Sequence, residues 1–191
     1  MNAFSLVLAS ASPRRAALLA QIGLVPAAVF PAGIDETQHR GEKPRALALR
    51  LTRAKADQVP GHGHFVLAAD TVVAAGRRIL AKTEDKGTAR AALELLSGRR
   101  HRVVTAVVLA APDGRRRERI SETVVAFARL AADQIEAYLE SDEWRGKAGS
   151  YAIQGRAALF VRFLSGSYSN VVGLPLFETA QLLRGFGWDL P

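Results

Sequence analysis

The sequence predicts an α/β fold, in which strands alternate with helices along most of the chain. Residues 65–73 form an almost unbroken apolar run, which is typical of a central strand buried on both faces. Residues 89–96 carry apolar side chains at helical spacing and are followed by Gly98. Because the 191 residues contain no repeat, low-complexity tract or linker, we expect one domain over residues 1–191, with two lobes flanking a cleft.

A strand and two helices are predicted before the central strand. Residues 6–9 are apolar and form the strand. Ser12 is expected to cap the first helix with its hydroxyl, and Pro13 suits the first helical position because a missing N–H costs nothing there. Gly23 is the expected end of this helix. The second helix begins at Pro44 and ends near residue 57.

The remaining elements follow the central strand and the 89–96 helix. A short strand over residues 78–80 lies between those two. A hairpin joins strands over 103–111 and 123–130, because the Pro-Asp-Gly sequence at 112–114 favours a turn. The prediction is completed by a helix over about 133–140, a strand over 159–164 and a last helix from near Pro175 through residue 182.

Composition excludes several classes of protein. Since the chain has no cysteine, it has no disulfide framework, thiolate chemistry or cysteine zinc site. No apolar run approaches the roughly 18 residues of a membrane span. The N-terminus lacks the charged region of a signal peptide. We therefore expect a cytoplasmic protein with no membrane partner.

The net charge of +8 raises the question of an anionic partner. The 26 Lys and Arg residues are spread along the chain, without a recognition-helix signature or an aromatic stacking platform. We therefore expect no stable nucleic-acid partner. A nucleic-acid-binding module is the alternative, and it predicts tight, salt-dependent DNA binding without turnover of a nucleotide.

A candidate phosphate site lies between the first strand and the first helix. The N–H groups at a helix N-terminus attract anions, and arginine offers paired donors to phosphate oxygens. Ser10, Ser12, Arg14 and Arg15 add two hydroxyls and two guanidinium groups at this point. The alternative is an ordinary Ser-Pro helix start with solvated arginines.

Asp70 is the candidate catalytic acid, because it interrupts a buried apolar strand. A carboxylate in such a place is costly unless it is paired, hydrogen-bonded or used on a metal. It could act as a general base or hold Mg²⁺, and the alternative is a structural salt bridge. Lys55, on the second helix, and Lys82, after the short strand, could each reach a triphosphate or be surface lysines.

The last candidate for ligand binding is a Gly-containing segment over residues 147–155. Its small residues allow a ligand to approach the backbone, and the Gln154 amide can read a base edge with a donor and an acceptor. The glycine patterns of P-loop and Rossmann dinucleotide sites are absent.

Taken in order, these motifs resemble those of the Maf nucleotide pyrophosphatases. The resemblance extends from Leu6 to about Leu183. The matching segments are residues 8–15 (LASASPRR), 53–56 (RAKA), 69–73 (ADTVV), 96–105 (LSGRRHRVVT), 147–155 (KAGSYAIQG) and 171–176 (VVGLPL).

The resemblance implies a fold, a reaction and roles for the matching residues. The fold is a mixed twisted sheet flanked by helices around a cleft, as in Maf and inosine triphosphatase-like proteins. The reaction is hydrolysis of a nucleoside triphosphate to a monophosphate and pyrophosphate. Asp70 would activate water for attack on the α-phosphorus. The residues implied to hold the triphosphate are Ser10, Ser12, Arg15, Lys55 and Lys82.

The resemblance also implies a divalent cation and a homodimer. Asp70 and Glu36 are the candidate metal ligands, and Mg²⁺ fits because it usually binds one or two carboxylates plus substrate phosphates. One departure concerns Lys82, which in the family is commonly followed by proline but here by Thr83. Since proline restricts φ, its absence could loosen the presentation of Lys82.

Three positions decide which branch of the family the chain resembles. Arg14, Thr71 and Gln154 match the branch that acts on dTTP and UTP, so we expect pyrimidine triphosphates, including modified ones, as substrates. The branch acting on 7-methyl-GTP, with an aromatic residue, Gln and Glu at these positions, is the alternative. A cell-division or septum-related nucleotide-binding protein, the role from which the family takes its name, is the other.

Overall fold

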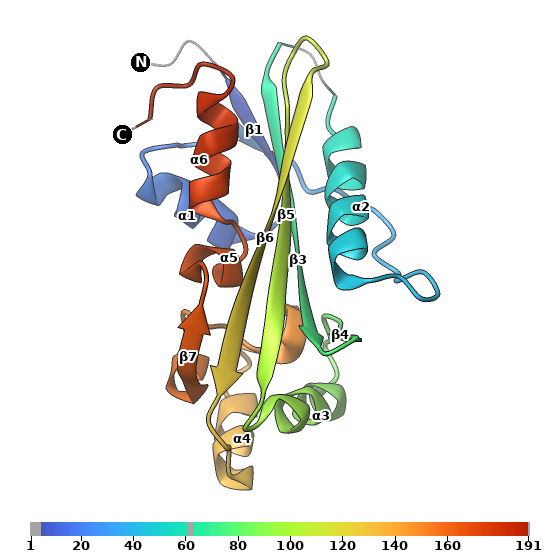
Figure 1. Ribbon diagram of the computed structural model, residues 1–191, viewed down its shortest axis with the longest axis vertical. Helices are drawn as coiled ribbons and strands as arrows, with labels where there is room; N and C mark the ends of the chain where they lie inside the picture. The colour runs from blue at the N-terminus through green and yellow to red at the C-terminus, as the bar shows by residue number, and fades with distance from the viewer. Residues whose placement is uncertain (1–4, 61–62, 191) are drawn as a thin grey trace.

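A twisted mixed sheet runs through the computed structural model, which describes residues 5–60 and 63–190 (Figure 1). Its strands are β1 (Leu6–Ala9), β2 (Ala28–Val29), β3 (Phe65–Ala75), β4 (Arg78–Leu80), β5 (Arg100–Ala110), β6 (Arg116–Phe127) and β7 (Val161–Ser165). Their order is β2-β1-β3-β5-β6-β7, and β4 pairs with β3. β1 runs parallel to β2 and β3, whereas the other pairs are antiparallel. The predicted α/β class is confirmed, and the sheet is mixed as the resemblance implied.

Helices cover both faces of this sheet, as Figure 1 shows. One face carries α1 (Pro13–Gln21), α5 (Tyr168–Val172) and α6 (Leu176–Arg184), and the other carries α2 (Pro44–Asp57). At one end of the long strands lie α3 (Lys86–Leu96) and α4 (Ala132–Leu139), and two 3₁₀ helices, η1 (Ala148–Ser150) and η2 (Arg156–Phe160), follow α4. Within the described ranges, no helix combines the length and apolar character that crossing a membrane requires.

The two faces of β3 belong to two different cores. Leu67 and Ala69 pack in the large core that includes side chains of α1 and α6, whereas Ala68 and Val72 pack in smaller clusters under α2. Successive side chains of a strand point to opposite faces, so this alternation extends to the next polar residues. Asp70 therefore faces α2, and Thr71 faces α1 and α5.

The edge of β3 is open over a short stretch in the middle of the sheet. β1 pairs with β3 from Phe65 to Ala68, and β4 pairs with it only from Val73 onward. Over 69–72, no described strand lies beside β3 on this edge. Ligands of α/β sheets bind where neighbouring strands stop, so this gap is the natural place for a site.

Several elements differ from the sequence predictions in their bounds. The strand β6 begins at Arg116, not at residue 123, because its polar first half pairs with β5 from Arg116 opposite Ala110 onward. Exposed ion pairs from Arg53 to Glu118 and from Arg116 to Asp57 also connect this half to α2. Part of the predicted 159–164 strand is η2, and β7 follows it. Pattern reasoning missed β2 and α5, which are two and five residues long.

Candidate active site

The turn between β1 and α1 surrounds the Arg15 side chain, which is 9% exposed. Its guanidinium donates from Nη1 to Ser10 Oγ (2.8 Å), from Nε to the Gly173 carbonyl (2.8 Å) and from Nη2 to Thr71 Oγ1 (3.4 Å). All three acceptors are uncharged. Burial lowers the pKa of Arg15, and the attraction of Asp70 only partly opposes this effect. A buried cation with neutral contacts is a favourable site for an anion from outside the chain.

Ser12 occupies the N-cap position of α1, with Pro13 at the first helical position as predicted. The prediction that the Ser12 hydroxyl caps the helix is wrong, because it makes no capping hydrogen bond. Instead, the Ser12 N–H donates to Ser10 Oγ (3.2 Å), so the cap interaction is replaced by a bond within the turn. The Ser12 side chain lines the neighbouring hollows, where it can contact a ligand.

Two carboxylates and two lysines form a chain across the gap in the sheet. Lys55 Nζ contacts both Asp70 Oδ1 (2.5 Å) and Glu36 Oε1 (2.6 Å), and Lys82 Nζ contacts Glu36 Oε2 (2.7 Å). The side chains of Asp70 and Lys55 are 3% and 7% exposed, so the salt bridge considered as the alternative for Asp70 is present. Among the described residues, Lys55 is the one hydrogen-bond donor to Asp70, which leaves Oδ2 available to a water molecule or a metal.

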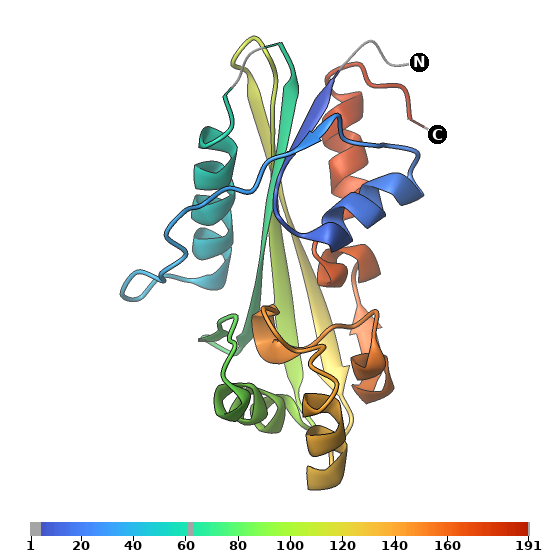
Figure 2. The same ribbon diagram turned by 180° about the vertical axis from the view of Figure 1, so that it is seen from behind.

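Glu36 connects the two lysines in this row of charged side chains. Its burial opposes ionisation, but hydrogen bonds from Lys55 and Lys82 outweigh that effect and lower the pKa of Glu36 to about 2. The carboxylate is therefore ionised at neutral pH. The chain between β2 and α2, which carries Glu36, crosses the sheet near β1 before it reaches α2 (Figure 2).

Three hollows meet at Lys82 and together make one continuous cleft. The largest, about 390 Å³, contains Asp70 and Glu36, and a second, about 310 Å³, contains Arg14 and Gln154. The third, about 120 Å³, lies against Ser10, Arg15 and Lys55 and joins the other two. Lys82 lines all three. The three hollows therefore bring acidic, cationic and amide side chains next to one another.

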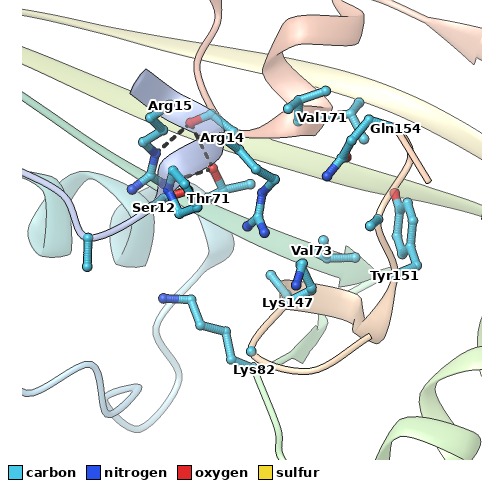
Figure 3. A pocket seen from close by; sticks show the side chains of 17 residues that line it. Ser12, Arg14, Arg15, Thr71, Val73, Lys82, Lys147, Tyr151, Gln154 and Val171 are labelled. Atoms are coloured by element: carbon cyan, nitrogen blue, oxygen red, sulfur yellow. Dashed lines mark hydrogen bonds between the residues drawn. The ribbon is translucent and has the colours of Figure 1, made fainter. Parts of the chain in front are cut away.

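The three positions that distinguish the branches lie together, although 140 residues separate the first from the last. Arg14, Thr71 and Gln154 all line the 310 Å³ hollow (Figure 3). Burial lowers the pKa of Arg14. Thr71 Oγ1 lies 3.0 Å from Thr105 Oγ1, which fixes the threonine that also accepts from Arg15. The Arg14 guanidinium and the Gln154 amide both line this hollow, where each can donate hydrogen bonds to a ligand.

The residue in place of proline, Thr83, is itself held in the structure. Its Oγ1 accepts a hydrogen bond from the Asp85 N–H (3.0 Å), and its carbonyl accepts one from the Gly146 N–H (3.2 Å). These bonds constrain the backbone beside Lys82, which makes an ion pair with Glu36.

Some residues of the site were not assigned roles from the sequence. Lys147 and Tyr151 line the hollow that contains Gln154, and burial, followed by the charge of Arg14, lowers the pKa of Lys147. Thr105 and Gly173 hold Thr71 and Arg15 in place. The available signal was weak: Thr105 is a polar residue in an apolar strand, and the others lie inside matching motifs.

Asp70 and Glu36 are the acidic pair that could contribute to a metal site. No group of three or more His, Cys, Asp or Glu residues suited to a metal occurs in the described part of the chain. Mg²⁺ does not need such a group, since it is commonly bound by one or two carboxylates with phosphate oxygens and water completing its shell. The spare oxygen of Asp70 and the nearby Glu36 are hard donors of the required type.

Comparison with known proteins adds a family to this geometry. The profile of the family described as "Maf-like protein" matches residues 5–186. A protein of Granulibacter bethesdensis named dTTP/UTP pyrophosphatase is 60% identical over 98% of this chain and 95% of its own length. Another of that name, from Rhodospirillum rubrum, is 64% identical over 96% of this chain and 88% of its own length. A solved HAM1 protein from Coxiella burnetii shares the fold, with a TM-score of 0.51, 17% identity and coverage of 95% of this chain and 99% of that chain.

Proposed function

The chain belongs to the Maf-like protein family, and from this premise we propose that it hydrolyses dTTP and UTP to the nucleoside monophosphate and pyrophosphate. The observation that carries the proposal is the buried Arg15 guanidinium with only neutral contacts, set across the open edge of β3 from Asp70. A triphosphate would supply the negative charge that Arg15 lacks among its contacts. The Asp70 carboxylate would act as the general base that hydrolysis needs.

The proposed reaction is attack of water on the α-phosphorus. Asp70 accepts the proton of that water through Oδ2, while Lys55 keeps the carboxylate in place through Oδ1. The bond from the α-phosphorus to the bridging oxygen breaks, and pyrophosphate leaves with that oxygen. Charge that develops on the phosphate oxygens is stabilised by fixed cations, which is the main catalytic effect in phosphoryl transfer.

The triphosphate is proposed to lie along the small hollow between the other two. Arg15, Lys55 and Lys82 are its cationic contacts, and the Ser10 and Ser12 hydroxyls complete the cradle. A ligand phosphate would compete with Glu36 for the two lysines, since both ammonium groups already contact that carboxylate. Substrate binding is therefore expected to redistribute this ion-pair chain.

The base is proposed to occupy the hollow lined by Arg14, Thr71 and Gln154. An amide can donate and accept at once, as the edge of uracil or thymine does. Arg14 adds donors for carbonyl oxygens. The same residues oppose 7-methyl-GTP, because the branch that acts on it carries different residues at all three positions.

A divalent cation, with Mg²⁺ as the proposed ion, would be held by Asp70 and Glu36. When bound, it would neutralise phosphate charge and lower the pKa of a coordinated water. Further parts of the proposal are one catalytic domain over residues 1–191, a cytoplasmic location, a homodimer, and no stable nucleic-acid or membrane partner. Light scattering on the purified protein tests the dimer.

The first experiment measures pyrophosphate release with Mg²⁺ from dTTP, UTP, CTP, dGTP and 7-methyl-GTP. We expect selective release from dTTP and UTP. Replacing the proposed base in Asp70→Asn should lower kcat by about 10²–10⁴, or about 3–5 kcal/mol. The matched control is Asp57→Asn, which removes an exposed carboxylate paired with Arg116 at the far end of α2.

Two outcomes would contradict the proposal. Turnover near the wild-type rate in Asp70→Asn would remove Asp70 from the role of base. No release from any triphosphate, with folded protein and several divalent metals tried, would favour a nucleotide-binding or nucleic-acid-binding protein.

A further inference from the structure

The segment that carries Gln154 follows a constrained backbone path. Gly149 has φ +71°, and a Cβ atom there would lie 2.7 Å from Val73 Cγ1, so only glycine fits this approach to β3. Ser150 has φ +57° although it carries a side chain, and it is completely buried. A residue other than glycine keeps a positive φ only where the surrounding structure holds its backbone in that conformation. The chain therefore enters the hollow along a path set by packing against β3.

Side-chain hydroxyls then hold the next two residues. The Ala152 N–H donates to Tyr138 OH (3.0 Å), which reaches it from α4. The Tyr151 hydroxyl is hydrogen-bonded to His101 Nε2 (2.8 Å) on β5. Beyond Gln154, the Arg156 N–H donates to a Glu143 carboxylate oxygen (2.8 Å). The base-reading amide thus lies between fixed points on both sides.

His101 lies behind the hollow and does not line it. Its side chain is 2% exposed and packs edge-on against Phe127 and Tyr151, with ring centroids 5.0 and 5.4 Å apart. Tyr151 does line the hollow, and Figure 3 shows its ring on the same side as Gln154. His101 therefore reaches the hollow through its hydrogen bond and ring contact with Tyr151.

We propose that His101 is a positioning residue for base recognition, because its hydrogen bond to Tyr151 holds the segment that presents Gln154 to the hollow. This inference rests on the proposed function. The strength of an amide hydrogen bond falls steeply with distance and angle, so a small displacement of Gln154 weakens the reading of the base. The phosphate contacts, which come from the turn between β1 and α1, from α1 and α2 and from Lys82 after β4, stay unchanged.

The test uses two single variants and their combination. His101→Phe keeps the ring packing and leaves the Tyr151 hydroxyl buried without its partner. Tyr151→Phe removes that hydroxyl and leaves His101 unpaired. The double variant replaces both polar groups by apolar rings of similar shape, which restores much of the lost stability. The matched control is Val125→Ala, since Val125 is fully buried and pairs with His101 in the register of β5 and β6.

We expect KM for dTTP to rise roughly tenfold in both single variants, with kcat within about threefold of wild type. The ratio of kcat/KM for dTTP to that for dCTP should fall by about the same factor. In the double variant, Tm should recover while this ratio stays low. Val125→Ala should lower Tm and leave the ratio unchanged. A wild-type ratio in both single variants, or its full recovery in the double variant, overturns the inference.

Hydrogen exchange of the full-length protein supplies a readout that needs no turnover. The amides of residues 151–156 should exchange faster in His101→Phe than in wild type, and not in Val125→Ala. Unchanged protection in His101→Phe overturns the inference even if the enzyme is active. Faster exchange in a protein that turns over no triphosphate would instead show that positioning holds and that the proposed function fails.

Discussion

Arg15 places a fixed positive charge inside the protein, with three uncharged acceptors around it. Such a group is costly to fold, because the attraction of Asp70 offsets only part of the desolvation of the charge. Asp70 differs, since Lys55 neutralises it directly. The site thus combines an acid paired with a lysine and a buried guanidinium whose three hydrogen-bond acceptors are uncharged, and the proposed binding of an anionic substrate rests on that difference.

The first prediction concerns Arg15→Met, which removes this buried charge and keeps much of the side-chain volume. The kcat/KM for dTTP should fall about 10²-fold, or about 2.7 kcal/mol, because paired donors to phosphate are lost. Tm should not fall, since the desolvation cost disappears with the charge. Steady-state kinetics and thermal unfolding measure the two effects.

The control is Arg162→Met, because Arg162 is exposed on β7, away from the residues that line the cleft. It should leave kcat/KM unchanged. A clear drop in Tm together with unchanged kcat/KM in Arg15→Met would show that Arg15 is a structural residue.

At the scale of elements, the site depends on where neighbouring segments stop. β1 ends at Ala9 and β4 begins its pairing at Val73, so the stretch of β3 that holds Asp70 and Thr71 is open at its edge. The turn between α5 and α6 then closes over one face, where the Gly173 carbonyl accepts from Arg15. The direction of this carbonyl depends on the backbone at Gly173, where φ is +131°. Residues with a side chain rarely adopt this conformation, whereas glycine does so readily.

The second prediction compares Gly173→Ala with Gly76→Ala. Both glycines have positive φ, so each variant should lose about 1–3 kcal/mol of stability. Only Gly173→Ala should also lower kcat/KM, by about tenfold, because a shifted carbonyl no longer holds Arg15. Gly76 lies in the turn between β3 and β4, with open space around it. Equal kcat/KM in the two variants would contradict this role of Gly173.

At the scale of the whole molecule, one sheet joins the side of the cleft that contains Asp70 to the side that contains Gln154. β5 pairs with β3 along nine residues, from Arg102 to Ala110, and carries His101 next to this stretch, within an aromatic cluster with Phe127 and Tyr151. This cluster buries a titratable ring, and burial lowers the pKa of His101 to about 4 from 6.5. The core thus contains a group whose protonation opposes folding.

The third prediction is a pH dependence of stability. The unfolded chain binds a proton at His101 below about pH 6.5, whereas the folded protein does not until about pH 4. This contribution to the free energy of unfolding is therefore fully present above pH 6.5 and is lost as pH falls toward 4. The total is about 3 kcal/mol.

Denaturant unfolding of wild type and His101→Phe between pH 7 and 4 tests this prediction. The difference between the two proteins should change by about that amount over the interval, because other titrating groups are common to both. A difference that stays constant with pH would show that His101 titrates as it does in the unfolded chain.

Periodicity was sufficient for most of the elements. The helix α2 has the predicted start at Pro44, and β3 includes the whole predicted run, because an apolar stripe or run reflects the face that each element buries. The start of β6 could not be predicted in this way, since its charged residues become a strand by backbone pairing with β5 and not by burying an apolar face. Backbone pairing leaves no periodic signal in a charged stretch.

The functional site was likewise predictable only in part from the sequence. The order of the motifs carried the resemblance to the family, and that resemblance implied Arg14, Thr71 and Gln154 as the positions that distinguish its branches. Only the folded chain shows that these three line one hollow and that Lys55 contacts both Asp70 and Glu36. Those contacts join separate segments, so they depend on the open edge of β3 and on the faces to which its side chains alternate.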